Sequence, residues 1–342
     1  MSWFPFDHHK LHELYQSDFS FRRESLILRP GDQTPSPIVS YGVASVFTPP
    51  EHRRNGYAAH MMRLLHRVLA PPSSLPPFPT DLWGHSPTIP QGIPIGDAVF
   101  SVLYSDVGPQ FYKLCGPMPG AEGWEVRDPW STMYEVSDVD LEEPTSKSLT
   151  WIEDQNMILD VMQTDAWDYM TRAMAEKARG YGPGMTLVAV KPSHIQTTYL
   201  NARHTLSQPS PGFPWEMKGR WGARYWNNDL AIPSYVLWVP EPYPNFTLVI
   251  TRMRVENARA LSVLVSAARH FARINGLKRV EVWNTIESGW MDQVSEAWGG
   301  YKIRRGEHLS CFAWYGKEKK DDVIWDLNEK YVGPSINVLR SH

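Results

Sequence analysis

The stretch YGVASVFTPPEHRRNGYAAHMMRLLHRVL, Tyr41–Leu69, decides the fold and begins with a short apolar run. Val43–Phe47 has the length and composition of a strand, and Pro49-Pro50 ends it because proline cannot donate to a sheet ladder. From Ala58 onward apolar residues recur at helical spacing and form one stripe, made of Met61, Met62, Leu65, Val68 and Leu69. The stretch therefore predicts a strand, a tight polar loop and an amphipathic helix.

The loop between this strand and helix has the features of an anion site. Because it leads into a helix through Asn55, Gly56, Tyr57 and Ala58, several backbone N–H groups are left unpaired and point one way. These donors and the positive end of the helix dipole favour a phosphate group. Gly56 lets a ligand approach the backbone, and the small Ala58 keeps the first turn open. An ordinary strand-to-helix turn is the alternative that these residues alone leave open.

Together with its flanking strand and helix, the loop resembles the acetyl-CoA-binding segment of the GCN5-related N-acetyltransferases (GNAT). Their pyrophosphate loop follows the pattern Arg/Gln-x-x-Gly-x-Gly/Ala, which Arg53, Gly56 and Ala58 match. The resemblance implies an α+β (mixed α/β) GNAT fold, with acetyl-CoA as co-substrate and no metal. The coenzyme-binding residues that it implies here are Val46, Phe47, Thr48, Arg53, Arg54, Asn55, Gly56, Tyr57 and Ala58.

In that family the strand before the loop has a bulge and separates from its neighbour, and the pantetheine arm pairs with the exposed backbone. The resemblance gives this part to the backbone of Val46, Phe47 and Thr48, with one N–H donating to the thioester oxygen. Packing of Val46 and Phe47 in the core is expected in either case. The strand is predicted to be Ile38–Phe47, in an antiparallel hairpin with Phe21–Leu28.

A second motif follows the Pro/Gly-rich segment Ala70–Val99, which is expected to run over the surface. Ala98–Tyr104 is rich in strand formers and leads into SDVGPQFYKLCG. Ser105, Gly108, Phe111, Tyr112 and Gly116 fall on the family's spacing for a strand end and a short helix. The resemblance implies that Tyr112 is the general acid for the departing thiolate and that Ser105 and Phe111 contact the coenzyme. A helix tyrosine packed on the sheet is the alternative.

Asp106 is the second catalytic candidate, because a carboxylate attracts an ammonium group and helps to deprotonate it. Capping of the helix by Ser105 and Asp106 is the competing expectation. Cys115 is expected to be structural, since direct amine attack on a thioester needs no acyl-enzyme. His85, in the surface segment, is expected to be solvated. No residue is identified as the general base beyond Asp106 and a chain of waters.

The two motifs SVFTPPEHRRNGYA and FSVLYSDVGPQFY together resemble those of the fungal lysine N6-acetyltransferases over residues 20–135. Weaker similarity continues through residues 199–203 and 221–224 and from Trp325 to Tyr331. The resemblance implies acetylation of the side-chain amine of free L-lysine, and thus a part in lysine degradation. Another small amine, such as a secondary metabolite or polyamine, stays open. A non-catalytic acyl-CoA-binding or scaffolding protein also stays open, because residues 1–20 are too few for the strand and two helices that precede this hairpin in the family.

Composition limits the other possibilities. The chain has 342 residues, a net charge of −3 and no block of lysine or arginine, so neither nucleic acid nor an anionic membrane is an expected partner. Cys115 and Cys311 are its only cysteines, which fits a reducing, cytoplasmic compartment. His8 and His12 stand at the spacing of a zinc pair but lack a clear third ligand. The oligomeric state is not predicted.

The second half of the sequence repeats the order of the first. Strands at Ser234–Pro240 and Asn245–Arg254, a helix at Asn257–Asn275, a strand at Val280–Trp283 and a helix at Gly289–Trp298 are predicted. Helices at Trp151–Gly180 and Ser193–Leu206 and a strand at Met185–Val190 precede them. Arg254-Val255-Glu256-Asn257-Ala258 has no glycine and contains an acid, so this lobe is not expected to bind CoA. The predicted limits are an acetyl-CoA-binding domain at 1–135, a linker at 136–150 and a second GNAT-like lobe at 151–342. Arg203 and Arg224 are weak carboxylate-binding candidates.

Overall fold

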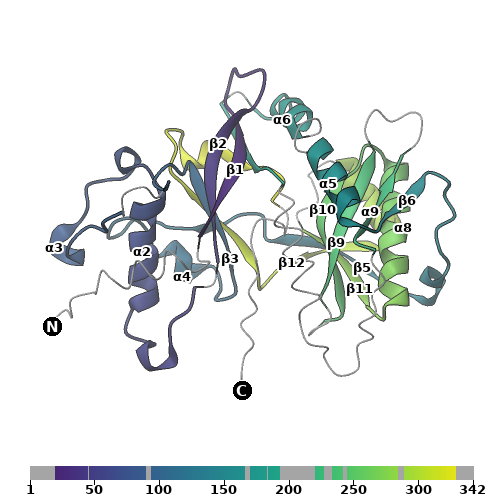
Figure 1. Cartoon of the computed structure of the whole chain (residues 1–342), viewed down its shortest axis with the longest axis horizontal. Helices are drawn as coiled ribbons and strands as arrows, with labels where there is room; N and C mark the ends of the chain where they lie inside the picture. The colour runs from purple at the N-terminus through teal and green to yellow at the C-terminus, as the bar shows by residue number, and fades with distance from the viewer. Residues whose placement is uncertain are drawn as a thin grey trace.

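Two sheets of seven described strands each organise the computed structural model (Figure 1). It describes residues 20–44, 46–89, 94–165, 170–182, 184–192, 220–226, 233–241, 245–283 and 289–328. The first sheet has the strand order β14-β7-β1-β2-β3-β13-β4, and the second has the order β12-β5-β11-β10-β9-β8-β6. The predicted mixed α/β class is confirmed, and the two sheets fit the predicted pair of lobes.

The first sheet is built around the predicted hairpin. β1 (Ser20–Leu28) and β2 (Ser36–Val43) pair antiparallel, and β2 pairs in parallel with β3 (Phe100–Ser105). The parallel pairing stops at Val43 and Leu103, although β3 continues to Ser105. The predicted end of β2 at Phe47 is therefore wrong, because the chain leaves β3 after Val43 to enter the loop before α2. This separation opens the sheet at the carboxyl ends of β2 and β3.

The helix α2 (Tyr57–Leu69) covers one face of this sheet, and its apolar stripe packs there with Tyr41, Leu103 and Trp124. Its buried residues are Met62, Leu64, His66, Val68 and Leu69. Phe100, Val102 and Phe312 form a separate cluster on the opposite face. Short elements complete this part of the chain: η1 (Pro50–His52), η2 (Pro72–Ser74), α3 (Thr80–Trp83), α4 (Gln110–Lys113) and β4 (Glu125–Val126).

The second sheet repeats this arrangement and confirms the predicted order of elements. In chain order the elements are β9 (Ser234–Glu241), β10 (Thr247–Arg254), α8 (Ala258–Ile274), β11 (Arg279–Trp283) and α9 (Gly289–Ala297). The parallel pairing of β10 with β11 ends at Ile250 and Val282, and a bulge lies between Ile250 and Arg252. Each lobe thus contains a parallel pair of strands that separates at its carboxyl end.

The two sheets exchange strands. β5 (Trp130–Glu135) comes from the first half of the chain but lies between β11 and β12 (Gly300–Arg304) in the second sheet. β13 (Leu309–Trp314) comes from the second half but lies between β3 and β4 in the first. β7 (Thr186–Val190) joins the first sheet beside β1, and β14 (Val323–Trp325) pairs with the other side of β7. The predicted limits 1–135 and 151–342 therefore do not coincide with sheet membership.

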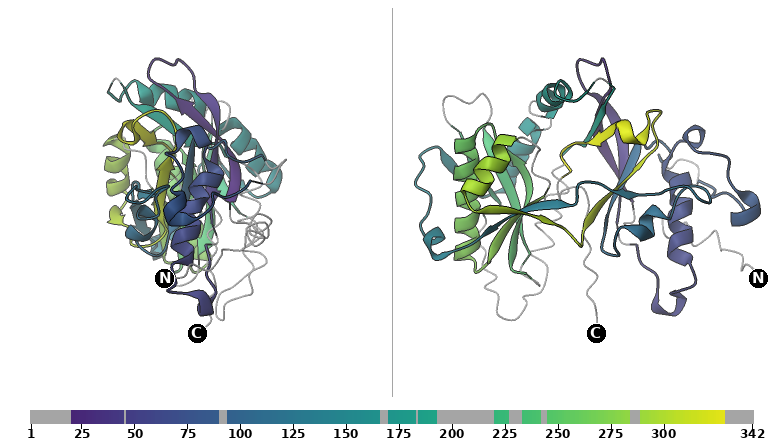
Figure 2. Two further views of the ribbon diagram at one scale, coloured as in Figure 1. Left: turned by 90° about the vertical axis from the view of Figure 1, so that its left-hand side faces the viewer. Right: turned by 180° about the vertical axis from the view of Figure 1, so that it is seen from behind.

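The two crossing segments run side by side between the sheets (Figure 2, right). Each contains a non-glycine residue with a positive φ, Asp128 at 45° and His308 at 50°. Arg305 ties the segments together. Its backbone N–H donates to the Pro129 carbonyl at 2.7 Å, and its guanidinium donates to the carbonyls of His308 at 2.6 Å and Asp128 at 3.3 Å. The crossing is therefore held by a buried arginine that contacts both strands.

The predicted helix from Trp151 to Gly180 is wrong at its start. Leu149–Ile152 is β6, paired with β8 (Gly222–Tyr225), because Trp151 and Ile152 extend the edge of the second sheet. α5 (Gln155–Thr164) then begins at a true cap, since the Asp154 carboxylate accepts from the Met157 N–H at 2.9 Å. α6 (Met170–Ala178) packs on β1 and β7.

The remaining short elements are η3 (Asp138–Leu141) and η5 (Lys320–Asp322). The predicted helix at Ser193–Leu206, with Arg203, lies outside the described residues, as do His8 and His12. Arg224 is described, and it pairs with Asp160 at 3.3 Å. Within the described ranges, no helix has the length and hydropathy needed to cross a bilayer, and no group of three potential His, Cys, Asp or Glu ligands is found.

Candidate functional site

The N-terminus of α2 is open. Gly56 is its N-cap residue, in the left-handed conformation at φ 79°, and no side chain from the described part of the chain caps the first turn. The first turn contains no acidic residue, and the whole segment 51–57 is exposed. A Cβ added at Gly56 would meet no atom within 4 Å, so the space over the turn is free. Free N–H donors, the helix dipole and open space fit a phosphate group.

The corresponding helix of the second lobe is closed. The side-chain oxygen of Asn257, the N-cap residue of α8, accepts from the Ala260 N–H at 2.9 Å. Glu256 precedes this cap and adds a negative charge beside the helix end. A phosphate group would meet an occupied donor and a like charge there.

Three predicted residues meet beside the open turn. Arg53 Nε donates to the carbonyl of Thr48 at 3.0 Å, and the Arg53 guanidinium lies over the ring of Phe47, 5.8 Å from its centroid. Phe47 is 48% exposed, so the expected core packing of this side chain is wrong, whereas Val46 packs against the α2-side cluster. The segment after β2 is therefore fastened to the loop before α2 by Arg53 and presents an aromatic surface next to it.

Three other residues of the loop, Arg54, Asn55 and Tyr57, lie beside the first turn of α2 and make only weak contacts. Arg54 is exposed with φ 66°, and the Asn55 amide reaches the His52 carbonyl at 3.5 Å. Tyr57 is 41% exposed and lies edge-on to His52, with ring centroids 5.8 Å apart. These side chains surround the turn at whose start Gly56 lies.

Tyr112 lies on α4, beside the same opening of the sheet, but it is buried. It packs with Leu103, Cys115 and Trp124, and its ring meets the Phe111 ring edge-on at 5.0 Å. Burial raises the pKa of the phenol above its usual value, and Cys311 and Asp106 raise it further. The hydroxyl therefore stays protonated at any ordinary pH, but it is a weaker acid than the sequence alone suggests.

Ser105 and Asp106 do not cap α4. The Ser105 hydroxyl accepts from the Val107 N–H at 3.3 Å and donates to the Gly108 carbonyl at 2.7 Å, which closes a local turn. α4 begins after Pro109 without a side-chain cap from the described residues, so the capping alternative is wrong. Asp106 instead contacts His308.

His308 is a site residue that the sequence did not indicate. Asp106 Oδ1 accepts from the His308 backbone N–H at 3.0 Å and lies 2.7 Å from Nδ1 of its ring. The two residues stand 202 positions apart, and only the exchange of β13 into the first sheet brings them together. No local pattern around His308 could have revealed the pair.

Aromatic side chains from both lobes surround this pair. The His308 ring stacks on Trp283 at 6.2 Å, and Tyr104 meets Trp283 at 5.6 Å. The guanidinium of Arg305 lies over Trp283 at 3.8 Å. Tyr104 is near the end of β3 and Trp283 ends β11, so the carboxyl ends of these strands from the two lobes meet at His308.

A buried hydrogen-bond chain fixes α2 to β3 and to the end of α4. Trp124 Nε1 donates to Ser101 Oγ at 2.9 Å, and Ser101 Oγ and the Tyr315 hydroxyl are 2.7 Å apart. The Tyr315 hydroxyl lies 2.9 Å from Nδ1 of His66, whose Nε2 lies 2.9 Å from the Cys115 carbonyl. Since that carbonyl only accepts, Nε2 carries the proton and Nδ1 accepts from Tyr315. The direction of each hydrogen bond in this chain is then fixed, and this arrangement requires a neutral imidazole on His66.

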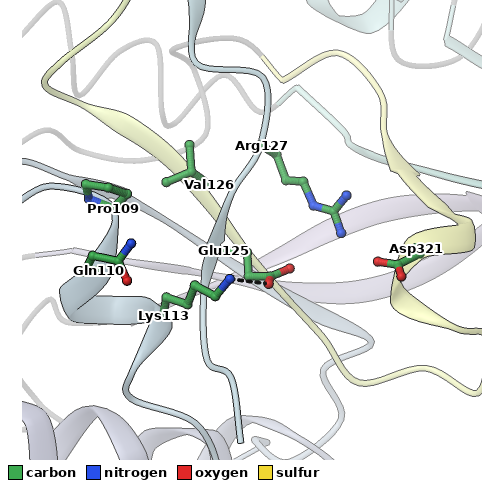
Figure 3. Close-up of a pocket in the computed structure, with 7 residues that line it drawn as sticks. All are labelled: Pro109, Gln110, Lys113, Glu125, Val126, Arg127 and Asp321. Carbon is green, nitrogen blue, oxygen red and sulfur yellow. Dashed lines mark ion pairs between the residues drawn. The ribbon is translucent and has the colours of Figure 1, made fainter.

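A separate cavity of about 290 Å³ lies at the edge strand β4 (Figure 3). Lys113 pairs with Glu125 at 3.3 Å across it, and Glu125 also pairs with Lys320 at 2.7 Å. The charges of Lys113 and Glu125 are thus paired. None of the predicted site residues lines it; the lining residues are Pro109, Gln110, Lys113, Glu125, Val126, Arg127 and Asp321.

Comparison with known proteins gives one family and a set of similar folds. Residues 134–333 match the family described as LYC1 GNAT-like C-terminal domain. No curated protein sequence matches the chain. Among solved structures, a probable N-acyltransferase from Enterococcus faecalis V583 is 11% identical over 92% of this chain and 66% of its own, with a TM-score of 0.43.

Two further structures are similar at the same level. A GCN5-related N-acetyltransferase from Kribbella flavida is 13% identical over 87% of this chain and 58% of its own, with a TM-score of 0.38. A tandem GNAT protein from the clavulanic acid biosynthesis pathway is 13% identical over 92% of this chain and 90% of its own, also with a TM-score of 0.38. The chain thus spans less than two thirds of the length of the first two. At these scores the similarities carry no argument about activity.

Proposed function

The chain belongs to the family of the LYC1 GNAT-like C-terminal domain, and on that basis we propose that it is an acetyl-CoA-dependent N-acetyltransferase. The acceptor that we propose is the side-chain amine of free L-lysine or a related small molecule. The enzyme class, an acyltransferase of the GNAT type, agrees with the family. The acetyl donor, the acceptor and the site residues are proposals that the geometry supports.

The open N-terminus of α2 is the observation that carries this proposal. Its free N–H groups, left-handed Gly56 and lack of an acidic first turn fit the diphosphate of a CoA thioester. The separation of β2 from β3 after Val43 leaves strand backbone beside this turn, where a pantetheine arm can pair by strand addition. We assign the diphosphate to Gly56, Tyr57 and Ala58 and the arm to the segment 46–48.

In the proposed reaction the acceptor nitrogen attacks the thioester carbonyl carbon directly. A C–N bond forms, the C–S bond breaks, and a backbone N–H of the segment 46–48 donates to the carbonyl oxygen while it carries charge. The thiolate leaves with a proton from Tyr112. Because burial raises the pKa of Tyr112, this transfer needs close contact between the phenol and the sulfur.

Isothermal titration with acetyl-CoA tests the proposed phosphate site at the N-terminus of α2 (the phosphate seat), by comparing Gly56→Asp with Gly56→Asn. Both side chains are similar in size and tolerate the left-handed conformation, so their difference isolates the charge. At about 6 Å and an effective dielectric constant of about 40, one like charge costs about 1.4 kcal/mol, a tenfold loss of affinity. Asp is expected to bind at least tenfold more weakly than Asn. Equal affinities would exclude the seat.

A panel of amines incubated with labelled acetyl-CoA tests the activity. Acetylation of free lysine or another small amine supports the proposal, and Tyr112→Phe should then lower kcat about 10²-fold while leaving acetyl-CoA affinity unchanged. Binding of acetyl-CoA without acetylation of any amine would instead identify a non-catalytic acyl-CoA-binding protein.

A further inference from the structure

We propose that His308, positioned by Asp106, is the general base that removes the proton from the acceptor amine, and that the acceptor is a primary alkylamine bound at the junction of the two lobes. This inference rests on the proposed function and assigns a residue to a step that the sequence left open. It depends on the exchange of β13, since that strand delivers His308 to the first lobe's site.

The location of His308 fits a base that faces the thioester. Leu309, the next residue, pairs with Ser105 at the carboxyl end of β3, directly past the point where β2 and β3 separate. Tyr104 packs with the cluster on the face of the first sheet away from α2, whereas Tyr112 packs with the α2-side cluster. A thioester lying in the opening would have the proposed acid toward α2 and the Asp106–His308 pair past the end of β3.

The contacts of the ring leave one nitrogen for catalysis. Asp106 Oδ1 lies 2.7 Å from Nδ1, so the carboxylate accepts the Nδ1 proton and selects the tautomer whose Nε2 has a free lone pair. Among the described residues the structure gives Nε2 no partner, and 23% of the side chain is exposed. A base held by a third group, with its other nitrogen open, is the arrangement that proton-transfer chemistry requires.

The backbone is held so that this contact is made. His308 has φ 50°, a conformation that is unfavourable for a non-glycine residue, and Arg305 Nη1 donates to its carbonyl at 2.6 Å. Trp283 stacks against the ring and also carries the Arg305 guanidinium. The titratable and charged groups around this centre, from both lobes, are Tyr104, Asp106, Asp128, Glu281 and Arg305.

The proton count balances. An amine that arrives as its ammonium gives one proton to Nε2 of His308 before attack, and His308 passes it to solvent. The attacking nitrogen loses a second proton to solvent as the amide forms. The departing thiolate takes one proton from Tyr112, and the resulting phenolate regains a proton from solvent, so that one proton is released in each turnover. No group is oxidised or reduced. The half-exposed Asp106 carboxylate and the rings of Tyr104 and Trp283 suit an alkylammonium, which contacts aromatic faces and carboxylates favourably.

The test compares His308→Ala and His308→Gln with His85→Ala, an exposed histidine outside the site, in the full-length chain. With the best amine of the panel at neutral pH, kcat/KM of both His308 variants should fall 10²–10³-fold, with acetyl-CoA affinity unchanged. The deficit should shrink about tenfold per pH unit as the amine deprotonates itself in solution, and added imidazole should restore part of the rate of His308→Ala. Asp106→Asn, which keeps an acceptor for Nδ1, should lose less.

Three results would overturn the inference. The first is a His308 variant as active as His85→Ala; the second is a loss that is independent of pH; the third is a loss that imidazole does not relieve. Thermal melting verifies that each variant is folded, and His308→Gln keeps a polar side chain if the alanine variant is unstable. If the unaltered protein acetylates no amine, the proposed function fails as well. If it is active and His308 is dispensable, only the present inference fails.

Discussion

Burial of His66 makes the stability of the protein depend on pH in a calculable way. Burial lowers the pKa of this imidazole to about 3, the hydrogen bond to Cys115 opposes that shift, and the charge of Arg67 adds to it. The unfolded chain binds a proton near the ordinary value of 6.5, while the folded protein does not. The contribution of His66 to stability is therefore fully present above pH 6.5 and is lost as the pH falls toward 3.

The size of the effect follows from the difference in protons bound. Between about pH 5.5 and pH 4 the unfolded state holds one proton more at this site, so the free energy of unfolding falls by about 1.4 kcal/mol per pH unit. Protonation would also put a donor on Nδ1 facing the Tyr315 hydroxyl, whose proton already points there. Protonating His66 in the folded protein therefore costs the hydrogen bond to Tyr315 in addition to the desolvation of the charged ring.

Urea unfolding at a series of pH values measures this slope. His66→Asn removes the titrating group, and although it destabilises the protein at every pH, its slope should be shallower by about 1.4 kcal/mol per unit between pH 5.5 and 4.5. His85→Asn, at an exposed position, should keep the original slope. Equal slopes in the unaltered protein and His66→Asn would show that His66 titrates normally, and the assigned direction of the hydrogen-bond chain would then be wrong.

Two further substitutions test features of the second lobe. Asn257→Ala removes the cap of α8 and should cost about 1 kcal/mol in urea unfolding, with no change in acetyl-CoA affinity, because this helix end is not the phosphate seat. A loss of acetyl-CoA binding would contradict that assignment. Asp165→Asn should cost about 3–5 kcal/mol, since it leaves Arg252 and Arg254 buried without their shared carboxylate. Burial raises the pKa of Asp165, but the guanidinium groups of Arg252 and Arg254 lower it by more, so the pKa lies below its usual value. A small loss of stability in Asp165→Asn would therefore mean that Asp165 is not charged in the folded protein.

The elements predicted well are those whose signals are local. α8 (Ala258–Ile274) lies between Asn257 and Asn275, its two cap residues, as the apolar spacing and these end signals indicated. α2 was expected from its stripe, but His66 was not recognised as a core residue, because its burial depends on Trp124, Tyr315 and the Cys115 carbonyl, which are distant in sequence.

What could not be predicted depends on distant pairing. β5 and β13 are ordinary short strands, and nothing in their composition says which sheet they join. The candidate site divides in the same way. The predicted phosphate loop around Gly56 was visible as a motif. The contact of Asp106 with His308 was not, because these two residues are 202 positions apart in the sequence.

The exchange of β5 and β13 also sets the order in which the protein can be completed during synthesis. Strand β3 cannot gain its neighbour on one side until residues 309–314, which follow it much later in the chain, have left the ribosome. Until then Leu103 and Phe100 lack the core contacts that β13 supplies, and the first sheet exposes an unpaired edge. The first sheet therefore cannot be completed before both halves of the chain have been made, and the same holds for the proposed catalytic site.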